Sequence, residues 1–170
     1  MKKLFLIDAY AMIYRAYYAL IRTPRINSKG MNTSAVMGFV NILHEIMTKE
    51  QPDYIAVAFD HGKTFRHDAF PLYKAQREET PEDIRRSVPI IKDILAAWHI
   101  PCLQTDGFEA DDIIGTLAAA VAASNTSKSD SIAAGKDDER GENQQVIDTY
   151  MATGDKDYGQ LVRGHVLMYK

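Results

Sequence analysis

The sequence predicts an α/β fold: a mostly parallel central sheet with helices on both faces. Short apolar runs typical of buried strands alternate along the chain with longer segments whose apolar residues recur at helical spacing. Two runs, Leu4–Ile7 and Tyr54–Phe59, are apolar without interruption, as expected of strands buried on both faces of a parallel sheet. The length of 170 residues is in the range of about 100–200 residues that suits a single domain.

The first half of the chain is expected to hold two strands and two helices. Leu4–Ile7 and Tyr54–Phe59 are the strands, and an aspartate follows each of them. Between them, Ala9–Ile21 and Thr33–Lys49 carry apolar side chains on one helical face. The intervening Arg22–Lys29 contains proline, asparagine and serine and therefore predicts a loop.

The second half continues the alternation of helices and strands. Pro81–Trp98 is an expected helix, because proline suits the first turn and the acids after it suit the positive end of the helix dipole. The other expected elements are a strand at Ile100–Gln104, a helix at Glu109–Ala123, a strand at Val146–Ala152, a short helix ending at Val162 and a strand at His165–Tyr169. His61–Thr80 shows no clean period.

Ser124–Gln145 interrupts this pattern with 22 residues that include three basic and five acidic side chains and one sizeable apolar residue, Ile132. Connections between helices and strands usually take about 2–6 residues. We expect a flexible surface insertion at 124–145 without folded structure of its own.

Composition excludes several classes of protein. With 46% hydrophobic and 25% charged residues the chain is globular, and the single cysteine, Cys102, excludes an internal disulfide framework. The longest weakly polar run, Ile113–Ala123, is shorter than the roughly 20 residues of a membrane span, and Asp8 ends the N-terminal apolar run too early for a signal peptide. We expect a cytoplasmic, nucleoid-associated protein that does not contact a membrane.

Carboxylates gather where strands are expected to end. Asp8, Asp60 and Asp155 each follow a different predicted strand, and in open α/β sheets the ligand site lies along that edge. A strand-to-helix turn and a position two residues past Asp155 bring four more acids to this edge: Glu109, Asp111, Asp112 and Asp157.

Seven carboxylates in one place need compensating positive charge. Oxygen donors favour Mg²⁺ or Mn²⁺, and a pair of such ions about 3.5–4 Å apart suits phosphodiester hydrolysis. Structural roles compete with this reading: acids in a first turn can be dipole partners, and an aspartate after a strand can be an N-cap. For Asp8 alone the cap is the better interpretation, but the conjunction favours a metal site.

Aromatic residues are interleaved with cations in the segment without a period. Phe65-Arg66 and Tyr73-Lys74 supply ring faces for bases and charges for phosphates, as single-stranded nucleic acid requires. For Arg85 and Arg86, a solvated helix face paired with acids at 82 and 83 is the preferred interpretation.

A set of motifs runs almost end to end along the chain. The pieces are Leu6-Ile7-Asp8 with Tyr14-Arg15, Thr33–Phe39, Phe59-Asp60, Thr64–His67, Tyr73-Lys74 with Arg77, Thr80-Pro81-Glu82, Gly107–Asp112 and Gly154–Val162. Together they resemble the N-terminal 5′-nuclease domain of bacterial DNA polymerase I, in the flap-endonuclease superfamily with its PIN-like fold. The acidic motif and the Gly-Asp-Lys-Asp motif are the most specific.

The resemblance implies a 5′-3′ exonuclease or flap endonuclease that uses Mg²⁺ or Mn²⁺ on 5′ flaps, nicks and RNA-primed duplexes in replication and repair, with a polymerase as partner. By this resemblance the metal ligands are Asp8, Asp60, Glu109, Asp111, Asp112, Asp155 and Asp157. Lys74 and Arg77, on a helical arch, hold the scissile phosphate, and Tyr73 stacks on the terminal base. Arg15 contacts a phosphate, and the helix start with Thr33, Gly38 and Phe39 is a platform for the DNA junction.

The resemblance stops at the last predicted strand. The family's next acidic segment and its helix–hairpin–helix element find no match, so we expect a fragment, a split protein or a degenerate copy. Two alternatives stay open: a non-catalytic DNA-binding remnant, and an aspartyl phosphatase or phospho-acceptor domain. The latter is weaker, because a common phosphatase has a second aspartate where this chain has Tyr10.

The net charge of −3 first argues against nucleic acid as a partner. Removing the seven candidate ligands from 23 acids leaves 16 against 20 bases, or +4. Two divalent ions would take the whole chain from −3 to +1. We therefore expect a concentrated acidic pocket within an otherwise basic protein whose DNA binding weakens as salt rises.

Overall fold

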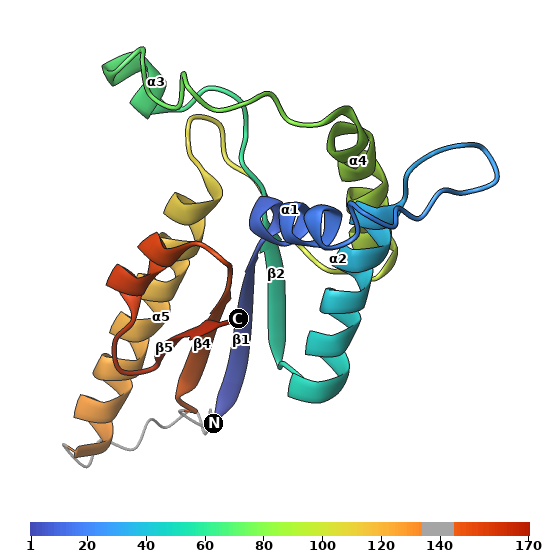
Figure 1. Cartoon of the computed structure of the whole chain (residues 1–170). Helices are drawn as coiled ribbons and strands as arrows, with labels where there is room; N and C mark the ends of the chain where they lie inside the picture. Colours follow the sequence, from blue (N-terminus) through green and yellow to red (C-terminus); the bar gives the residue numbers. More distant parts are fainter. Residues whose placement is uncertain (134–144) are drawn as a thin grey trace.

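A five-stranded, all-parallel sheet forms the centre of the molecule (Figure 1). The computed structural model describes residues 1–133 and 145–170, and for residues 128–133 it describes the backbone alone. The strands run in the order β3-β2-β1-β4-β5. Their bounds are β1 (Lys2–Asp8), β2 (Tyr54–Ala58), β3 (Cys102–Leu103), β4 (Ile147–Ala152) and β5 (Val166–Tyr169). The five predicted strands and the α/β class are confirmed.

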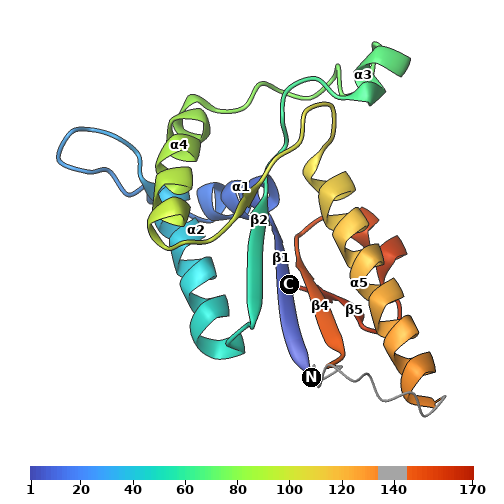
Figure 2. The ribbon, with the colours of Figure 1, turned by 180° about the vertical axis from the view of Figure 1, so that it is seen from behind.

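Helices cover both faces of this sheet (Figures 1 and 2). One face carries α1 (Ala9–Ala19), α2 (Ser34–Glu45) with its π-helical end η1 (Ile46–Glu50), and α4 (Glu82–Ala97); the other carries α5 (Ala110–Ala133) and the 3₁₀ helix η2 (Lys156–Leu161). Strand β1 serves both layers, because Phe5 and Ile7 enter the first core and Leu6 enters the second.

Helices α1 and α2 pack closely at one point. A Cβ placed on Gly38 would lie 2.6 Å from the Cβ of Ala16, so only glycine fits there. The neighbouring Phe39 is 2% exposed and belongs to the core. Gly38 therefore allows the close approach of the two helices, and Phe39 contributes to the core.

Helix α5 corrects the expectation of an unstructured insertion over 124–145. The helix continues to Ala133 and so includes the first ten of those residues; residues 134–144 lie outside the described part. A tertiary contact supports the start of this extension. The buried Asn125 side chain donates to the carbonyl oxygen of Ile147 (2.8 Å) and accepts from its amide (3.1 Å), which ties α5 to the start of β4. In the described part of the chain, no helix is long and apolar enough to cross a membrane.

The strand order changes direction between β1 and β4. From β1 the chain moves outward to β2 and β3, whereas β4 and β5 lie on the other side. Ligand sites of open parallel sheets lie at the carboxyl end of such a switch point. Residues 61–81 pass over this end of the sheet (Figure 1). Their one regular helix is α3 (Phe65–Ala69), so the segment that the resemblance assigns to a helical arch consists mainly of turns and irregular backbone.

Candidate active site

A cavity of about 240 Å³ lies at the carboxyl end of β1, β2 and β4. Five of the seven predicted carboxylates line it: Asp8, Asp60, Glu109, Asp111 and Asp155. The other two, Asp112 and Asp157, line a neighbouring cavity that shares Asp111 with the first. Successive residues of an α-helix differ by about 100° in direction, so Asp111 and Asp112 cannot face the same way. The expectation that all seven acids meet in one place is wrong, because only five of them line this cavity.

Two of these aspartates are N-caps of helices, and a third binds the first amide of another helix. Asp8 is the N-cap of α1 and accepts from the amide of Ala11 through Oδ1 (3.0 Å). Asp155 caps η2 in the same manner, through the amide of Asp157 (3.0 Å). Asp60 accepts from the amide of Ala110 (2.7 Å) and so fixes the start of α5 from another strand. The N-cap interpretation considered for Asp8 is thus correct, and it coexists with a place in the cavity.

The second oxygen of Asp8 has partners of its own. Oδ2 accepts from the hydroxyls of Thr153 (3.2 Å) and Tyr158 (3.3 Å). Burial raises the pKa of Asp8, and the charge of Asp60 adds to this, although the hydrogen bonds oppose it. Burial also raises the pKa of Tyr158, together with the nearby carboxylates, so the phenol stays a neutral donor.

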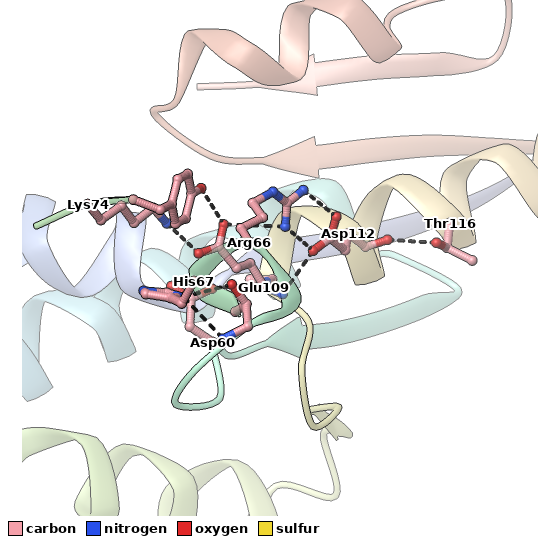
Figure 3. Close-up of polar contacts among 10 residues, drawn as sticks. Asp60, Arg66, His67, Lys74, Glu109, Asp112 and Thr116 are labelled. Carbon is pink, nitrogen blue, oxygen red and sulfur yellow. Dashed lines mark hydrogen bonds and ion pairs between the residues drawn. The ribbon is translucent and has the colours of Figure 1, made fainter. Parts of the chain in front are cut away.

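Glu109 is held by the segment that crosses above it (Figure 3). Its side chain is 6% exposed; Lys74 Nζ lies 2.6 Å from Oε1, and Tyr73 donates to Oε2 (3.0 Å). Burial alone would raise the pKa of Glu109, but the bonds from Lys74 and Tyr73 outweigh it and the pKa is lowered. Lys74 has φ of 57°, an unusual backbone conformation for a residue other than glycine.

Arg66 binds Asp112 with two parallel hydrogen bonds of 2.6 and 2.7 Å (Figure 3). This bidentate pair lowers the pKa of Asp112, chiefly through the hydrogen bonds from Arg66. The Arg66 guanidinium also lies 4.6 Å from the centre of the half-exposed Phe65 ring, which packs against Phe108. The basic segment therefore neutralises Glu109 and Asp112 directly.

Asp8, Asp60, Asp111 and Asp155 are the carboxylates of the cavity that Lys74 and Arg66 do not bind in this way. Burial raises the pKa of Asp111, and the charges of Asp112 and Glu109 raise it further. An oxygen-only donor set under mutual repulsion fits a hard divalent cation. No three Asp, Glu, His or Cys residues of the described part lie close enough to hold an ion as they stand, so binding would require side chains to move together.

The other predicted contact residues are dispersed. Arg77 lines the cavity beside Lys74. Arg15 is exposed on α1, and its charge acts on Glu45 of α2. Thr33 is the residue before α2 and its hydroxyl donates to the carbonyl oxygen of Arg25 (2.9 Å). Phe65 borders a separate cavity beside β3.

Sequence reasoning missed the hydroxyl groups of the site. Tyr158 lines both carboxylate cavities, and Tyr14 donates to Thr80 (2.9 Å), which anchors the end of the crossing segment on α1. The available signal was position: Tyr158 follows the Gly-Asp-Lys-Asp motif directly, three residues after the cap Asp155.

Comparison with known proteins places these features in a family. The family model described as the 5′-3′ exonuclease N-terminal resolvase-like domain matches residues 3–139. DNA polymerase I of Bacillus caldotenax is 40% identical over 167 residues, which cover 97% of this chain and 16% of that protein. A 5′-3′ exonuclease of Aquifex aeolicus is 40% identical over 119 residues, or 69% of this chain and 40% of its own length. The chain thus spans a minor part of these relatives.

A solved structure agrees in fold. The flap endonuclease of bacteriophage T5, crystallised as a pseudo-enzyme–product complex with DNA and metal ions, matches with a TM-score of 0.56 at 18% identity, covering 99% of this chain and 54% of the phage protein. The resemblance inferred from the motifs is confirmed by the family model and the relatives. The chain belongs to the family of 5′-3′ exonuclease N-terminal resolvase-like domains.

Proposed function

We propose that this chain is the core of a divalent-metal-dependent 5′ nuclease, a 5′-3′ exonuclease or flap endonuclease acting on DNA 5′ flaps, nicks and RNA-primed ends. One observation carries the proposal: carboxylates from the ends of three strands and the start of α5 share a cavity with Lys74 and Arg77 of the segment above them. The carboxylates of the cavity suit cations, and Lys74 and Arg77 suit phosphates. A DNA polymerase, in the same polypeptide or separate, is the partner that this substrate implies.

Asp8, Asp60, Asp111 and Asp155, joined by Glu109, are the residues that would hold Mg²⁺ or Mn²⁺. Such ions lower the pKa of an attacking water and stabilise the charge of the transition state. The residues of the chain do the rest. Lys74 and Arg77 offer positive charge to the scissile phosphate, and Tyr73 offers a ring to the terminal base. Because Lys74 is bound to Glu109, a phosphate must compete with that carboxylate for it.

The direct test is hydrolysis of a labelled 5′-flap substrate with Mg²⁺ or Mn²⁺, comparing the wild-type chain with Asp111→Asn. We expect the variant to lose activity by at least 100-fold, because it replaces a charged carboxylate with a neutral amide of nearly the same size. A matched control is Asp106→Asn, since the Asp106 side chain is 95% exposed and does not line the cavity. Equal cleavage by wild-type protein and Asp111→Asn would remove the metal-site assignment.

A second candidate, a DNA-binding module without catalysis, is favoured by one observation. Lys74 and Arg66 already neutralise two of the carboxylates, and no three ligands are preassembled in the described part of the chain. Flap binding without turnover at any metal concentration would favour this candidate. In either case binding should weaken as salt rises and should fall in the double variant Lys74→Ala, Arg77→Ala. Unchanged binding in the double variant would contradict the placement of the phosphate.

A further inference from the structure

The Asp8 carboxylate has a hydrogen-bond donor assigned to each of its oxygens. The amide of Ala11 fixes Oδ1, and the hydroxyls of Thr153 and Tyr158 share Oδ2. The distances of 3.2 and 3.3 Å to the hydroxyls are long for O–H···O bonds, as two donors to one oxygen can require. Asp8 is thereby oriented by three separate elements: α1, the end of β4 and η2.

Packing in the core fixes the position of Tyr158. The residue is 3% exposed and packs in the second core with Leu6, Ala110 and Ile114, which fixes the ring. Tyr158 lines both carboxylate cavities, and its hydroxyl donates to Asp8 Oδ2 (3.3 Å). A phenol buried among apolar side chains with its hydroxyl aimed at a carboxylate is a rigid donor, because the ring has only two rotatable bonds.

We propose that Tyr158 is a positioning residue whose hydroxyl, through its bond to Oδ2, holds the Asp8 carboxylate in the orientation needed to bind a divalent cation. The proposal rests on the proposed function, since it concerns the same carboxylate. Partners of metal ligands fix ligand orientation, and their removal costs about 10–100-fold in metal affinity or activity. Without the phenol, Asp8 keeps two of its three donors, so we expect a loss near the lower end of this range.

The test is Tyr158→Phe, which removes the hydroxyl and leaves the ring in the core. Mn²⁺ binding to the full chain without DNA is measured by calorimetry or by the electron paramagnetic resonance of free Mn²⁺. We expect the Mn²⁺ dissociation constant to rise about tenfold. In flap cleavage, the Mn²⁺ concentration for half-maximal rate should rise by the same factor, while the rate at saturating Mn²⁺ stays within about twofold.

Tyr54→Phe is the matched control, because it makes the same change at the opposite end of the sheet, where the hydroxyl contacts Lys2 (3.1 Å). It should leave both Mn²⁺ readouts unchanged. Thermal unfolding of each metal-free variant separates positioning from folding. If Tyr158→Phe lowers the melting temperature but binds Mn²⁺ as the wild type does, the residue is structural and the proposal is overturned.

Failure of the inference and failure of the proposed function give different results. A wild-type chain that binds Mn²⁺, with Tyr158→Phe and Tyr54→Phe indistinguishable from it, overturns the role of Tyr158 alone. A wild-type chain that neither binds Mn²⁺ nor cleaves a flap overturns both. Binding without cleavage favours the non-catalytic module, and the Mn²⁺ dissociation constants still decide the role of Tyr158.

Discussion

Lys74→Met removes the ammonium that neutralises Glu109 and retains most of the side-chain volume. Removal of one partner lowers the free energy of unfolding by about 3–5 kcal/mol for a fully buried ion pair. For an exposed pair the loss is about 0–1 kcal/mol. The Glu109 side chain is 6% exposed and that of Lys74 is 25% exposed, and Tyr73 continues to donate to Glu109. We therefore expect the free energy of unfolding at pH 7, without metal, to fall by about 1.5–2.5 kcal/mol.

The loss should depend on pH. The pKa of Glu109 in the folded wild type is below its ordinary value of 4.5. A carboxyl group of this kind contributes stability that is present above its unfolded-state pKa and is lost as pH falls through its folded-state pKa. In Lys74→Met, burial of Glu109 is no longer offset by the ammonium, and the pKa of Glu109 rises. The difference between wild type and variant should therefore be full at pH 7 and shrink as pH falls through 4.5.

Urea unfolding at pH 7 and at pH 4, in a chelator, measures this difference. Lys49→Met is the control, because Lys49 pairs with Glu45 on an exposed helix surface. It should cost less than Lys74→Met at pH 7. A loss for Lys74→Met that is the same at both pH values, or no larger than that of Lys49→Met, would refute the idea that Lys74 neutralises a buried carboxylate.

Two glycines and Asp111 give two further predictions. Gly38→Ala should lower the free energy of unfolding by about 1–3 kcal/mol, because the new Cβ would lie 2.6 Å from the Cβ of Ala16. Gly115→Ala, whose Cβ would lie 3.4 Å from Leu161, should leave the free energy of unfolding unchanged or raise it by up to about 1 kcal/mol, and urea unfolding measures both variants. Asp111→Asn should raise the melting temperature of the metal-free chain at pH 7, since the raised pKa of Asp111 means that its ionised form opposes folding, and the gain should vanish below pH 3.8. Excess Mn²⁺ should reverse the order by stabilising the wild type alone, and a variant less stable than wild type without metal would contradict this account.

Periodicity predicted the sheet well because its strands carry the simplest signal. Leu4–Ile7 and Tyr54–Phe59 are uninterrupted apolar runs, and they became β1 and β2 with shifts of one or two residues at their ends. The extension of α5 beyond Ala123 had no such signal, since Ser124–Ala133 is polar and rich in serine. The hydrogen bonds between Asn125 and Ile147 help to hold this part of α5 in place. These residues are 22 positions apart, so local helix propensity cannot reveal the contact.

The same division applies to the site. Topology alone brings Asp8, Asp60 and Asp155 to one edge, so their meeting followed from the order of strands and helices. Which basic side chain binds which carboxylate depends on side-chain directions, and these cannot be read from the spacing of residues in the sequence. Lys74 binds Glu109 and Arg66 binds Asp112 across 35 and 46 residues, from a segment that has no period to orient it.

The helix caps explain why structural and catalytic interpretations of these aspartates need not compete. A carboxylate has two oxygens, and a cap uses one: Asp8 gives Oδ1 to Ala11 and turns Oδ2 toward Thr153 and Tyr158. The cap fixes the carboxylate relative to α1, and the parallel sheet fixes α1 relative to the other strand ends. An aspartate that begins a helix at the carboxyl end of a strand is thus held in place before any ligand binds. For this reason the caps at Asp8 and Asp155, and the bond from the Ala110 amide to Asp60, orient each carboxylate separately, and an ion would still have to draw the side chains together.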